Sequence, residues 1–456
     1  MPQSSVNPAT GKLLATIADH TDDELERLLA RAAAAARTWS ATPIDARTAM
    51  LRRMAVLLDE ERESLARLAT LEMGKPIQAA RDEVAKCALL CVYYADEAPG
   101  FLEPARVVRD GHEDGSVHFL PLGVLLAVMP WNFPYWQAIR AAVPALAAGN
   151  AVLLKHASNV PQCALAIERL FIAAGARDGA FTTLLVSAAR VGALIDDPRV
   201  AAVTLTGSEA AGRDVGARAG GAIKPCVLEL GGSDPFIVLA SADVDAAAAT
   251  AVRARCINNG QSCIAAKRFI VHEAVYDAFA GRFAAAMRAL RLGDPLEAAT
   301  DIGPLATAAI RREVDDQVRR TVAAGARVLT GGIMPQGNGN YYAPTVLVDV
   351  PRDSAAAREE IFGPVAPLFR VTSADEALAL ANDTTFGLGA SVWTRDPAEA
   401  RRFGADVEAG SVFINAMVAS DPRFPFGGVK ASGIGRELAR EGLRAFVNVK
   451  TVRGAP

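Results

Sequence analysis

From Gly123 onward, short apolar runs alternate with stretches of helical composition, and this alternation limits the possible folds more than any other feature of the sequence. Each stretch is bounded by glycine or proline. Buried parallel strands joined by crossover helices produce such a pattern. The sequence therefore predicts an α/β fold, and its first series of strands is expected at Gly123–Met129, Ala151–Lys155, Phe181–Val186 and Val200–Thr206.

A second series of apolar runs follows and predicts a second α/β domain. Helical stretches such as Val244–Cys256 and Leu305–Ala324 separate these runs. The expected strands are Phe236–Leu239, Phe269–Val271, Val365–Val371, Ala390–Trp393 and Ser411–Ile414.

The segments outside these two series differ in character. The first hundred residues are expected to be helical, because Asp22–Trp39 and Ile44–Met73 carry apolar positions at helical spacing. Gly115–Leu120 and Phe446–Val452 are extended and β-rich, and we expect them to pair as an arm outside either domain. The exposed edges of such an arm would invite a partner subunit.

Composition narrows the class of partner. A chain of 456 residues with 51% hydrophobic side chains is expected to form about two to four domains, with room for a cleft between them. A formal charge of −3 favours neither nucleic acid nor an anionic membrane as a partner. No apolar run reaches the roughly 20 residues that span a bilayer, and no signal peptide is recognisable. We expect a cytoplasmic protein that acts on a small molecule.

The six cysteines and five histidines do not cluster at metal-ligand spacing, so neither a disulfide framework nor a metal site is expected. Without clustered histidines, a histidine-based catalytic triad is also disfavoured. Any covalent chemistry must therefore be activated in another way.

The segment Thr206–Gly212 closes a predicted strand and opens a predicted helix. Free backbone N–H groups and the helix dipole at such a junction accept phosphate oxygens. Arg213 and Asp214 stand where a Walker loop needs Lys and Ser or Thr, and the glycines do not fit GxGxxG. The residues therefore fit either a phosphate site or a plain strand-to-helix turn.

The loop Pro130–Pro134 follows the predicted strand Gly123–Met129, where parallel strands open into a binding crevice. Its prolines and aromatic residues make it rigid enough to aim the carboxamide of Asn132. A preorientated amide is what an oxyanion hole requires. The alternative is a solvent turn in which Asn132 caps the next helix.

Two more residues complete a candidate constellation. Cys263 follows the polar turn Asn258–Ser262 and is predicted to be more exposed than the other cysteines, as a reactive thiol must be. Glu229 lies at an apolar strand end before two glycines, where burial would raise its pKa and suit it to act as a general base. A structural ion pair is the alternative role for Glu229. Nucleophile, base and oxyanion donor together suit acyl chemistry.

These residues resemble the aldehyde dehydrogenase superfamily over the whole chain, from Asn7–Gly11 to the C-terminal arm. The motifs that carry the resemblance are Pro130–Pro134, Lys155, Thr206–Ser208, Glu229–Gly232, Gly260–Cys263, Glu359–Pro364, Pro425–Lys430 and Gly435–Glu437.

The resemblance implies roles for these residues. Cys263 would attack the aldehyde, Asn132 and the Cys263 backbone N–H would hold the oxyanion, and Glu229 would activate the hydrolytic water. It also implies NAD or NADP as cofactor, bound by Lys155, Ser158, Trp131, Gly207, Ser208, Gly212, Glu360 and Phe362.

Within the superfamily, the string Lys155–Pro161 resembles short bacterial succinate-semialdehyde dehydrogenases. Many relatives have Glu at the position of Ser158, and the absence of that carboxylate predicts tolerance of NADP. Arg140 is expected to bind the substrate carboxylate. Better-known enzymes of this group have a second arginine at the position of Ile257, and Ser420 and Arg423 are expected to supply the missing contact.

The implied fold is a Rossmann-type cofactor domain, an α/β catalytic domain and an oligomerisation arm, in a homodimer or homotetramer. The cofactor domain is expected to comprise residues 1–108 and 122–231 with 432–444 packing back, the catalytic domain 232–431, and the arm 109–121 and 445–456.

Other functions remain open at this point. One is a broad-specificity aliphatic or other ω-semialdehyde dehydrogenase in which Arg140 is unused. Another is a cysteine thioesterase or hydrolase without a cofactor, and a third is a non-catalytic protein, which the presence of Cys263, Glu229 and Asn132 disfavours. Acyl transfer to coenzyme A is disfavoured by Glu229, because that subgroup typically lacks the glutamate.

Overall fold

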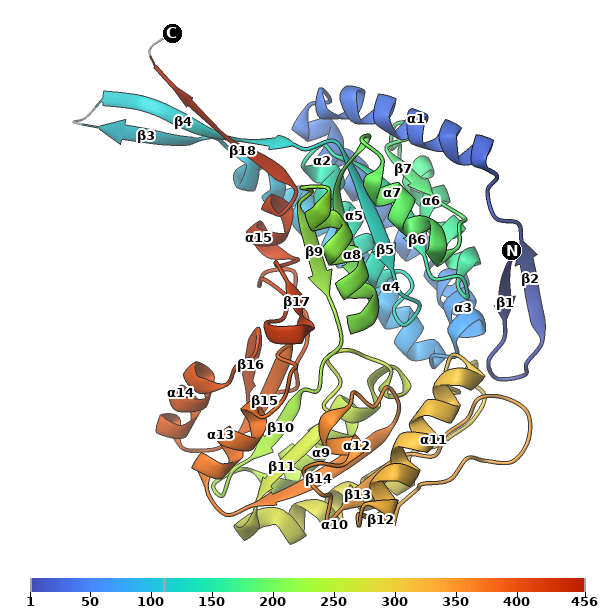
Figure 1. The fold of residues 1–456 in the computed structure, drawn as a ribbon, viewed down its shortest axis with the longest axis vertical. Helices are drawn as coiled ribbons and strands as arrows, with labels where there is room; N and C mark the ends of the chain where they lie inside the picture. The colour runs from blue at the N-terminus through green and yellow to red at the C-terminus, as the bar shows by residue number, and fades with distance from the viewer. Residues whose placement is uncertain (1, 110–111, 455–456) are drawn as a thin grey trace.

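The computed structural model describes residues 2–109 and 112–454, in which two largely parallel sheets lie one above the other (Figure 1). The strand order of the first sheet is β17-β9-β8-β5-β6-β7. All of its neighbouring strands are parallel except β17, which pairs antiparallel with β9. Its strands are β5 (Val124–Met129), β6 (Ala151–His156), β7 (Phe181–Thr183), β8 (Val200–Thr206), β9 (Cys226–Glu229) and β17 (Gly433–Ile434).

The second sheet has the order β12-β13-β14-β11-β10-β15-β16. It is parallel apart from the edge strand β12, which is antiparallel to β13. Its strands are β10 (Pro235–Val238), β11 (Arg268–His272), β12 (Arg327–Thr330), β13 (Thr345–Val348), β14 (Val365–Val371), β15 (Gly389–Trp393) and β16 (Ser411–Ile414).

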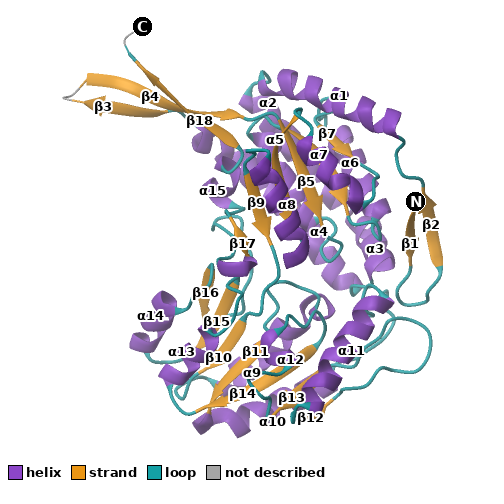
Figure 2. Ribbon diagram, viewed as in Figure 1, coloured by secondary structure: helices purple, strands orange, loops and turns teal. Residues whose placement is uncertain are grey.

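Helices flank both sheets (Figure 2). In the first layer α5 packs against β5 and β6, and in the second α10 packs against β11. The helices are α1 (Asp22–Ser40), α2 (Ile44–Glu60), α3 (Arg62–Met73), α4 (Ile77–Leu102), α5 (Trp136–Ala147), α6 (Pro161–Ala173), α7 (Val191–Asp196), α8 (Glu209–Gly221), α9 (Val244–Cys256), α10 (Glu273–Ala289), α11 (Ala308–Ala323), α12 (Ala355–Arg358), α13 (Ala374–Asn382), α14 (Pro397–Asp406) and α15 (Ala439–Arg444).

An arm projects away from both sheets (Figure 1). It consists of β3 (Ala105–Arg109), β4 (His112–Pro121) and β18 (Val447–Arg453), in the order β18-β4-β3. The expected partners Gly115–Leu120 and Phe446–Val452 do pair, with Gly115 opposite Arg453 and Leu120 opposite Asn448. Val107 and Val108 on β3 are 47% and 64% exposed, so the arm carries apolar side chains that this chain does not cover.

The α/β fold expected from the sequence is confirmed, and the departures are local. The N-terminus forms a hairpin, β1 (Gln3–Val6) and β2 (Leu13–Ile17), where only helices were expected. Its turn depends on Gly11, whose φ of 73° is accessible to glycine, and periodicity does not reveal a hairpin this short. The edge strand β12 and its neighbour β13 were also missed. The expected strand Phe181–Val186 ends at Thr183.

The strand order brings distant loops together. Strands β5, β8 and β9 are neighbours and parallel, so their carboxyl ends lie at the same edge of the first sheet. The loop of Asn132, the start of α8 and the segment after Glu229 leave from these ends. Residues 230–234 then cross to β10 in the second sheet, so this edge faces the second layer (Figure 1).

Within residues 2–109 and 112–454, none of the helices combines the length and apolar character needed to cross a membrane.

Candidate active site

Two cavities meet at Cys263. The larger has a volume of about 590 Å³ and the smaller about 220 Å³. Cys263 and Gln137 line both. A ligand in either cavity can therefore approach the same sulfur atom, as a reaction between two bound molecules requires.

A strained turn before Cys263 presents it to the cavities. Asn258 and Asn259 adopt φ values of 52° and 59°, in the left-handed region that most side chains avoid. The Asn259 side-chain amide donates to the carbonyls of Gly74 and Pro304, both at 3.0 Å, and its oxygen accepts from the Gly303 N–H at 2.8 Å. These bonds hold the backbone in a conformation that local propensity alone would not select.

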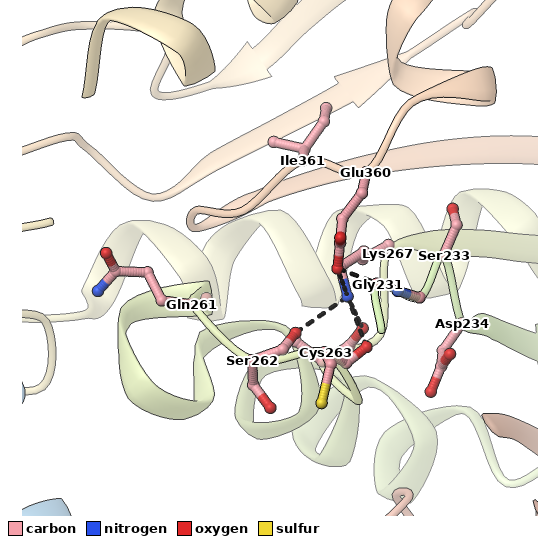
Figure 3. A network of polar contacts seen from close by, with 12 residues as sticks. Gly231, Ser233, Asp234, Gln261, Ser262, Cys263, Lys267, Glu360 and Ile361 are labelled. Atoms are coloured by element: carbon pink, nitrogen blue, oxygen red, sulfur yellow. Dashed lines mark hydrogen bonds and ion pairs between the residues drawn. The ribbon is translucent and has the colours of Figure 1, made fainter. Parts of the chain in front are cut away.

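Lys267 reinforces the same loop from the backbone side. Its Nζ donates to the carbonyls of Ser262 at 2.9 Å and Cys263 at 2.7 Å, and lies 3.1 Å from the Glu360 carboxylate (Figure 3). Glu360 in turn accepts from the Gly232 N–H at 3.1 Å. The Cys263 sulfur points away from this network, so Lys267 fixes the loop and leaves the thiol free (Figure 3).

The Cys263 thiol is protonated in this environment. Burial raises the pKa of Cys263 to about 12, although Lys267 and Arg140 act in the opposite direction. Negative charge on Glu229 and Glu360 raises the pKa further. Because the thiolate is the nucleophilic form, a nearby base must remove the proton when the thiol reacts.

Glu229 is a suitable base. Its side chain is 1% exposed, and burial, supplemented by the negative charge of Glu437, raises its pKa to about 8. Arg140 and Arg436 favour the charged form. The Gly428 N–H also lowers the Glu229 pKa, but neither carboxylate oxygen makes a hydrogen bond of normal geometry within the described part of the chain. The Glu229 carboxyl group therefore has a pKa near neutral pH and can accept and release a proton.

Asn132 lies beside the cysteine loop. Its side-chain nitrogen donates to the Gln261 carbonyl at 3.1 Å, and its own backbone carbonyl accepts from the Asn258 amide at 2.6 Å. A carboxamide nitrogen carries two hydrogens, so one remains to be donated to a ligand. Asn132 and Cys263 thus line the same cavity, and Glu229, which lines neither cavity, is close enough for its charge to act on the Cys263 thiol.

Glu83 on α4 fixes the loop that carries Asn132. Its carboxylate accepts from the N–H groups of Tyr135 at 2.8 Å and Trp136 at 2.9 Å, at the start of α5. Lys75 is ion-paired with Glu83, and its ammonium lies 4.1 Å from the centroid of the Phe133 ring. Both charged groups are buried. Anchoring by a paired carboxylate explains why a loop at the edge of the sheet can be rigid.

The larger cavity has the features of a dinucleotide site. Five of the residues expected to contact the cofactor line it: Trp131, Gly207, Ser208, Glu360 and Phe362. The Trp131 and Phe362 rings meet edge to face, with centroids 5.8 Å apart. Ser208 caps α8 by accepting from the Ala211 N–H, so the positive end of the helix dipole faces the cavity. An elongated anionic ligand with a planar ring fits this lining.

The other three expected cofactor residues do not line this cavity. Lys155 lies at the end of β6 and is 7% exposed, and burial lowers its pKa. Ser158 is exposed in the following turn. A Cβ atom at Gly212 would clash with the Leu230 side chain, so this glycine allows α8 to pack closely against the strand end.

His156, which follows Lys155, makes hydrogen bonds with the backbone. It is 4% exposed, and its Nε2 lies 2.8 Å from the Pro134 carbonyl while Nδ1 accepts from the Ala157 N–H. Nε2 therefore carries the proton and donates to Pro134. Burial lowers the His156 pKa to about 4, so the ring is neutral.

The expected substrate residues separate into three environments. Arg140 lines the smaller cavity, but its guanidinium lies 2.6 Å from the Glu437 carboxylate and both side chains are buried. Ser420 also lines this cavity. Arg423 lines neither cavity: its side chain is 72% exposed and paired with Asp421 at 2.6 Å. The structure thus provides no support for Arg423 as a substrate contact.

The smaller cavity contains a cation that the sequence analysis missed. Lys86 on α4 lines it together with Ser420, Arg140 and Cys263. No motif marks this lysine, because it occurs in an alanine-rich helix where a charged residue indicates only a solvated face. Glu437, Glu83 and Lys267 were also missed as site residues, although Glu437 belongs to the motif Gly435–Glu437, because only tertiary packing brings them to the site.

No group of three or more His, Cys, Asp or Glu side chains that could hold a metal ion occurs in the part of the chain that the structure describes.

Comparison with known proteins identifies close relatives. A sequence profile described as "Aldehyde dehydrogenase family" matches residues 2–452. "Succinate-semialdehyde dehydrogenase [NADP(+)] 1" of Mycobacterium tuberculosis is 54% identical over 454 residues, which cover 99% of each chain.

Solved structures agree with this chain closely. Gox0499 superposes with a TM-score of 0.98 at 42% identity, and succinic semialdehyde dehydrogenase from Streptococcus pyogenes, solved with NADP+ as the cofactor, with 0.97 at 36% identity. Both comparisons cover 100% of each chain.

Proposed function

The chain belongs to the aldehyde dehydrogenase family, and on that premise we propose that it oxidises succinate semialdehyde to succinate with NADP or NAD as hydride acceptor. The observation that carries the proposal is that Cys263 lines two cavities, one suited to a dinucleotide and one to a short aldehyde. The names of its relatives support the choice of substrate and of NADP.

In the first half of the proposed reaction, the Cys263 sulfur attacks the aldehyde carbon. The thiol proton passes to Glu229, whose raised pKa lets it accept a proton near neutral pH. The carbonyl oxygen becomes an oxyanion in a thiohemiacetal, and the free N–H of the Asn132 carboxamide and the Cys263 backbone N–H stabilise it.

Trp131, Gly207, Ser208, Glu360 and Phe362 would hold the dinucleotide, with Lys155 and Ser158 on the ribose of its adenosine half. A nicotinamide bound there would supply the hydride acceptor needed to convert the thiohemiacetal to a thioester. Ser158 places no carboxylate beside this ribose, so a 2′-phosphate meets no repulsion there.

In the second half, water hydrolyses the thioester. Glu229 first releases the thiol proton to solvent. It then takes a proton from the water as the water attacks the carbonyl carbon, and Asn132 again stabilises the oxyanion. The carbon–sulfur bond breaks, Cys263 recovers its proton, and the carboxylic acid leaves as its anion. The Glu229 carboxyl group thus serves as base in both halves of the reaction. A carboxylate held in a permanent ion pair could not do so.

A broad-specificity aldehyde dehydrogenase is the second candidate. It is favoured by the apolar lining of the smaller cavity, which includes Ile257, Ile264, Phe133 and Val418. Under this alternative the enzyme would oxidise butanal as efficiently as succinate semialdehyde.

One experiment decides between the two candidates. Purified protein is assayed with succinate semialdehyde and with butanal, each with NADP and with NAD, by absorbance at the reduced-nicotinamide band. We expect the highest kcat/KM with succinate semialdehyde and NADP. Equal kcat/KM for the two aldehydes would favour the broad enzyme, and hydrolysis of thioesters without any nicotinamide reduction would contradict both.

We also propose the domain limits, location and assembly expected from the sequence. The cofactor domain comprises residues 122–231 and the part of residues 1–108 that precedes β3 (Ala105–Arg109), a strand that belongs to the arm. Residues 232–431 form the catalytic domain, and the arm joins subunits in a homodimer or homotetramer. The exposed Val107 and Val108 on β3 support the role of the arm. All six cysteines are unpaired, as expected in the reducing cytoplasm.

A further inference from the structure

Hydride transfer needs two reacting centres at a fixed separation. In the proposed reaction one centre is attached to Cys263, and the other is held by the segment Glu359–Pro364, which carries Glu360 and Phe362. These two segments are far apart in the sequence, and the structure contains contacts that fix one against the other. The inference that follows from these contacts rests on the proposed function.

The backbones of the two segments are in direct contact. A Cβ atom at Gly260 would clash with the carbonyl group of Gly363, so only glycine allows this close approach. Arg255, whose side chain is fully buried, donates to the Gly260 carbonyl at 2.6 Å and to the Ile361 carbonyl at 3.5 Å. The backbone positions are thus fixed, but the side chain of Glu360 has rotatable bonds of its own and needs a separate restraint.

Two groups restrain the Glu360 carboxylate. Its Oε1 accepts from the Gly232 N–H at 3.1 Å and pairs with Lys267 Nζ at 3.1 Å. Its Oε2 lies over Gly231, where a Cβ atom would clash with it. Because both partners engage Oε1 and Glu360 lines the larger cavity, Oε2 is the oxygen that can accept from a ribose hydroxyl.

Lys267 has no hydrogen left for a ligand. An ammonium group has three hydrogens. Among the described residues, the closest acceptors of Lys267 Nζ are the Cys263 carbonyl at 2.7 Å, the Ser262 carbonyl at 2.9 Å and Glu360 Oε1 at 3.1 Å (Figure 3). The Lys267 side chain is 3% exposed and lines neither cavity. It therefore acts on other residues of the protein rather than on the substrate or the dinucleotide.

We propose that Lys267 is a positioning residue that holds Glu360 in its ribose-binding orientation and fixes that orientation relative to Cys263. One ammonium group joins the backbone of the nucleophile to the carboxylate that orients the nicotinamide ribose. The two reacting centres, which are bound in different cavities, thereby keep a constant separation. A flexible Glu360 would have to be ordered when the dinucleotide binds, and the nicotinamide would be held less firmly.

The charges agree with this role. Burial has the largest effect on the Cys263 pKa and raises it, Lys267 has the largest opposing effect, and the charge of Glu360 raises the pKa further. The Lys267 ammonium thus offsets the negative charge that the Glu360 carboxylate places near the thiol. Removing Lys267 should make the thiolate harder to form, and removing the Glu360 charge as well should reverse part of that change.

The first test measures the dinucleotide side. The Kd for NADP is measured by quenching of tryptophan fluorescence, and the first turnover of nicotinamide reduction by rapid mixing at saturating NADP and succinate semialdehyde. We expect Lys267→Met to raise the Kd by roughly threefold to tenfold and to slow the first turnover by roughly tenfold to a hundredfold. Lys267→Arg keeps the charge and should recover part of both losses. In a Glu360→Ala background, Lys267→Met should change the Kd by less than about twofold, because the carboxylate that it positions is absent.

The second test measures the thiol side and needs no dinucleotide. Alkylation of Cys263 by iodoacetamide is followed at a fixed pH by mass spectrometry of the peptide that contains it, because the rate follows the thiolate fraction. Lys267→Met should slow alkylation by about threefold or more, and the double variant Lys267→Met/Glu360→Ala should react faster than Lys267→Met. A loss of packing alone would not be reversed by the second substitution.

Lys224→Met is the matched control. Lys224 also donates to two backbone carbonyls, those of Ile195 and Asp197, and it lines neither cavity. Its substitution should leave the Kd for NADP, the first turnover and the alkylation rate unchanged.

Two results would overturn the inference. One is a Lys267→Met variant with the Kd and first turnover of the wild type. The other is a double variant in which the effects of Lys267→Met and Glu360→Ala on the Kd multiply, as those of independent residues do. If the wild type neither binds NADP nor reduces nicotinamide, the proposed function fails together with the inference. If the wild type does both and the two substitutions act independently, only the inference fails.

Discussion

Arg140 lies 2.6 Å from Glu437, and Arg140 also lines the smaller cavity with Cys263. Burial has the largest effect on the pKa of the base Glu229 and raises it; Glu437 raises it further and Arg140 acts in the opposite direction. The buried ion pair therefore contributes to the electrostatic environment of the base.

The first prediction concerns this pair. Arg140→Met leaves Glu437 buried and unpaired, so we expect the free energy of unfolding to fall by about 3 kcal/mol. The double variant Arg140→Met/Glu437→Gln removes both charges and should recover part of the loss. Chemical denaturation measures these changes, with the exposed Arg37→Met as control. A different outcome would contradict this prediction. If Arg140→Met is as stable as the wild type but has lost its preference for the semialdehyde, Arg140 binds the substrate.

The second prediction concerns the nucleophile. Cys263→Ala should abolish aldehyde oxidation, because no other thiol lines the two cavities, and should leave dinucleotide binding intact. Binding is measured by quenching of tryptophan fluorescence, since Trp131 lines the larger cavity. Cys226→Ala, a half-buried cysteine outside both cavities, should remain active. Turnover by Cys263→Ala would point to a different nucleophile.

The third prediction concerns the base in the two half-reactions. Glu229→Gln can accept a proton neither from the Cys263 thiol nor from water, so both half-reactions should slow. We expect steady-state turnover to fall by about a hundredfold or more, and the first turnover of nicotinamide reduction to slow as well in rapid mixing. Glu60→Gln, an exposed control, should behave as wild type. A first turnover at the wild-type rate would show that a base other than Glu229 deprotonates Cys263.

The fourth prediction is a pH profile. The pKa of Glu229 is raised from 4.5 to about 8, and only the deprotonated carboxylate can act as base. With saturating butanal, kcat should therefore rise with pH and level off above about 8. Butanal is used because it is uncharged, so its binding does not depend on the charges of the cations that line the smaller cavity. A kcat that is flat between pH values of about 6 and 9 would place another step or another base in control.

The fifth prediction concerns the cofactor. Ser158→Glu adds a carboxylate where the adenosine ribose is proposed to bind. It should lower the ratio of kcat/KM for NADP to kcat/KM for NAD by at least roughly tenfold. This change in the ratio corresponds to about 1.4 kcal/mol. Ser158→Gln adds similar volume without charge and should shift the ratio much less. Equal shifts in the two variants would show that size, not charge, governs the choice.

The sequence predicted the parts of the fold that depend on local pattern. Gly123–Met129 is apolar throughout and forms the central strand β5, because such a run can only be buried on both faces. The polar residues Asn258–Ser262 also indicated a turn before Cys263, although not the left-handed backbone conformation that Asn258 and Asn259 adopt in it. The hairpin at β1 and β2 was missed because its strands are too short for a clear period.

Contacts between distant residues could not be predicted in the same way. Lys86 and Ser420 are 334 positions apart, and neither stands in a motif that announces the other. Arg140 was expected from the sequence to bind the substrate carboxylate, but its ion-pair partner Glu437 comes from a segment that returns to the first sheet only through tertiary packing. A single sequence contains no signal for such pairs.

The position of Cys263 between the two cavities has a consequence for inhibition. A small anion seated in the smaller cavity would leave the larger cavity empty, so it should not compete with the dinucleotide for the protein. A compound that extends past the Cys263 sulfur and occupies both cavities would compete with both ligands at once. Its affinity would combine two separate sets of contacts.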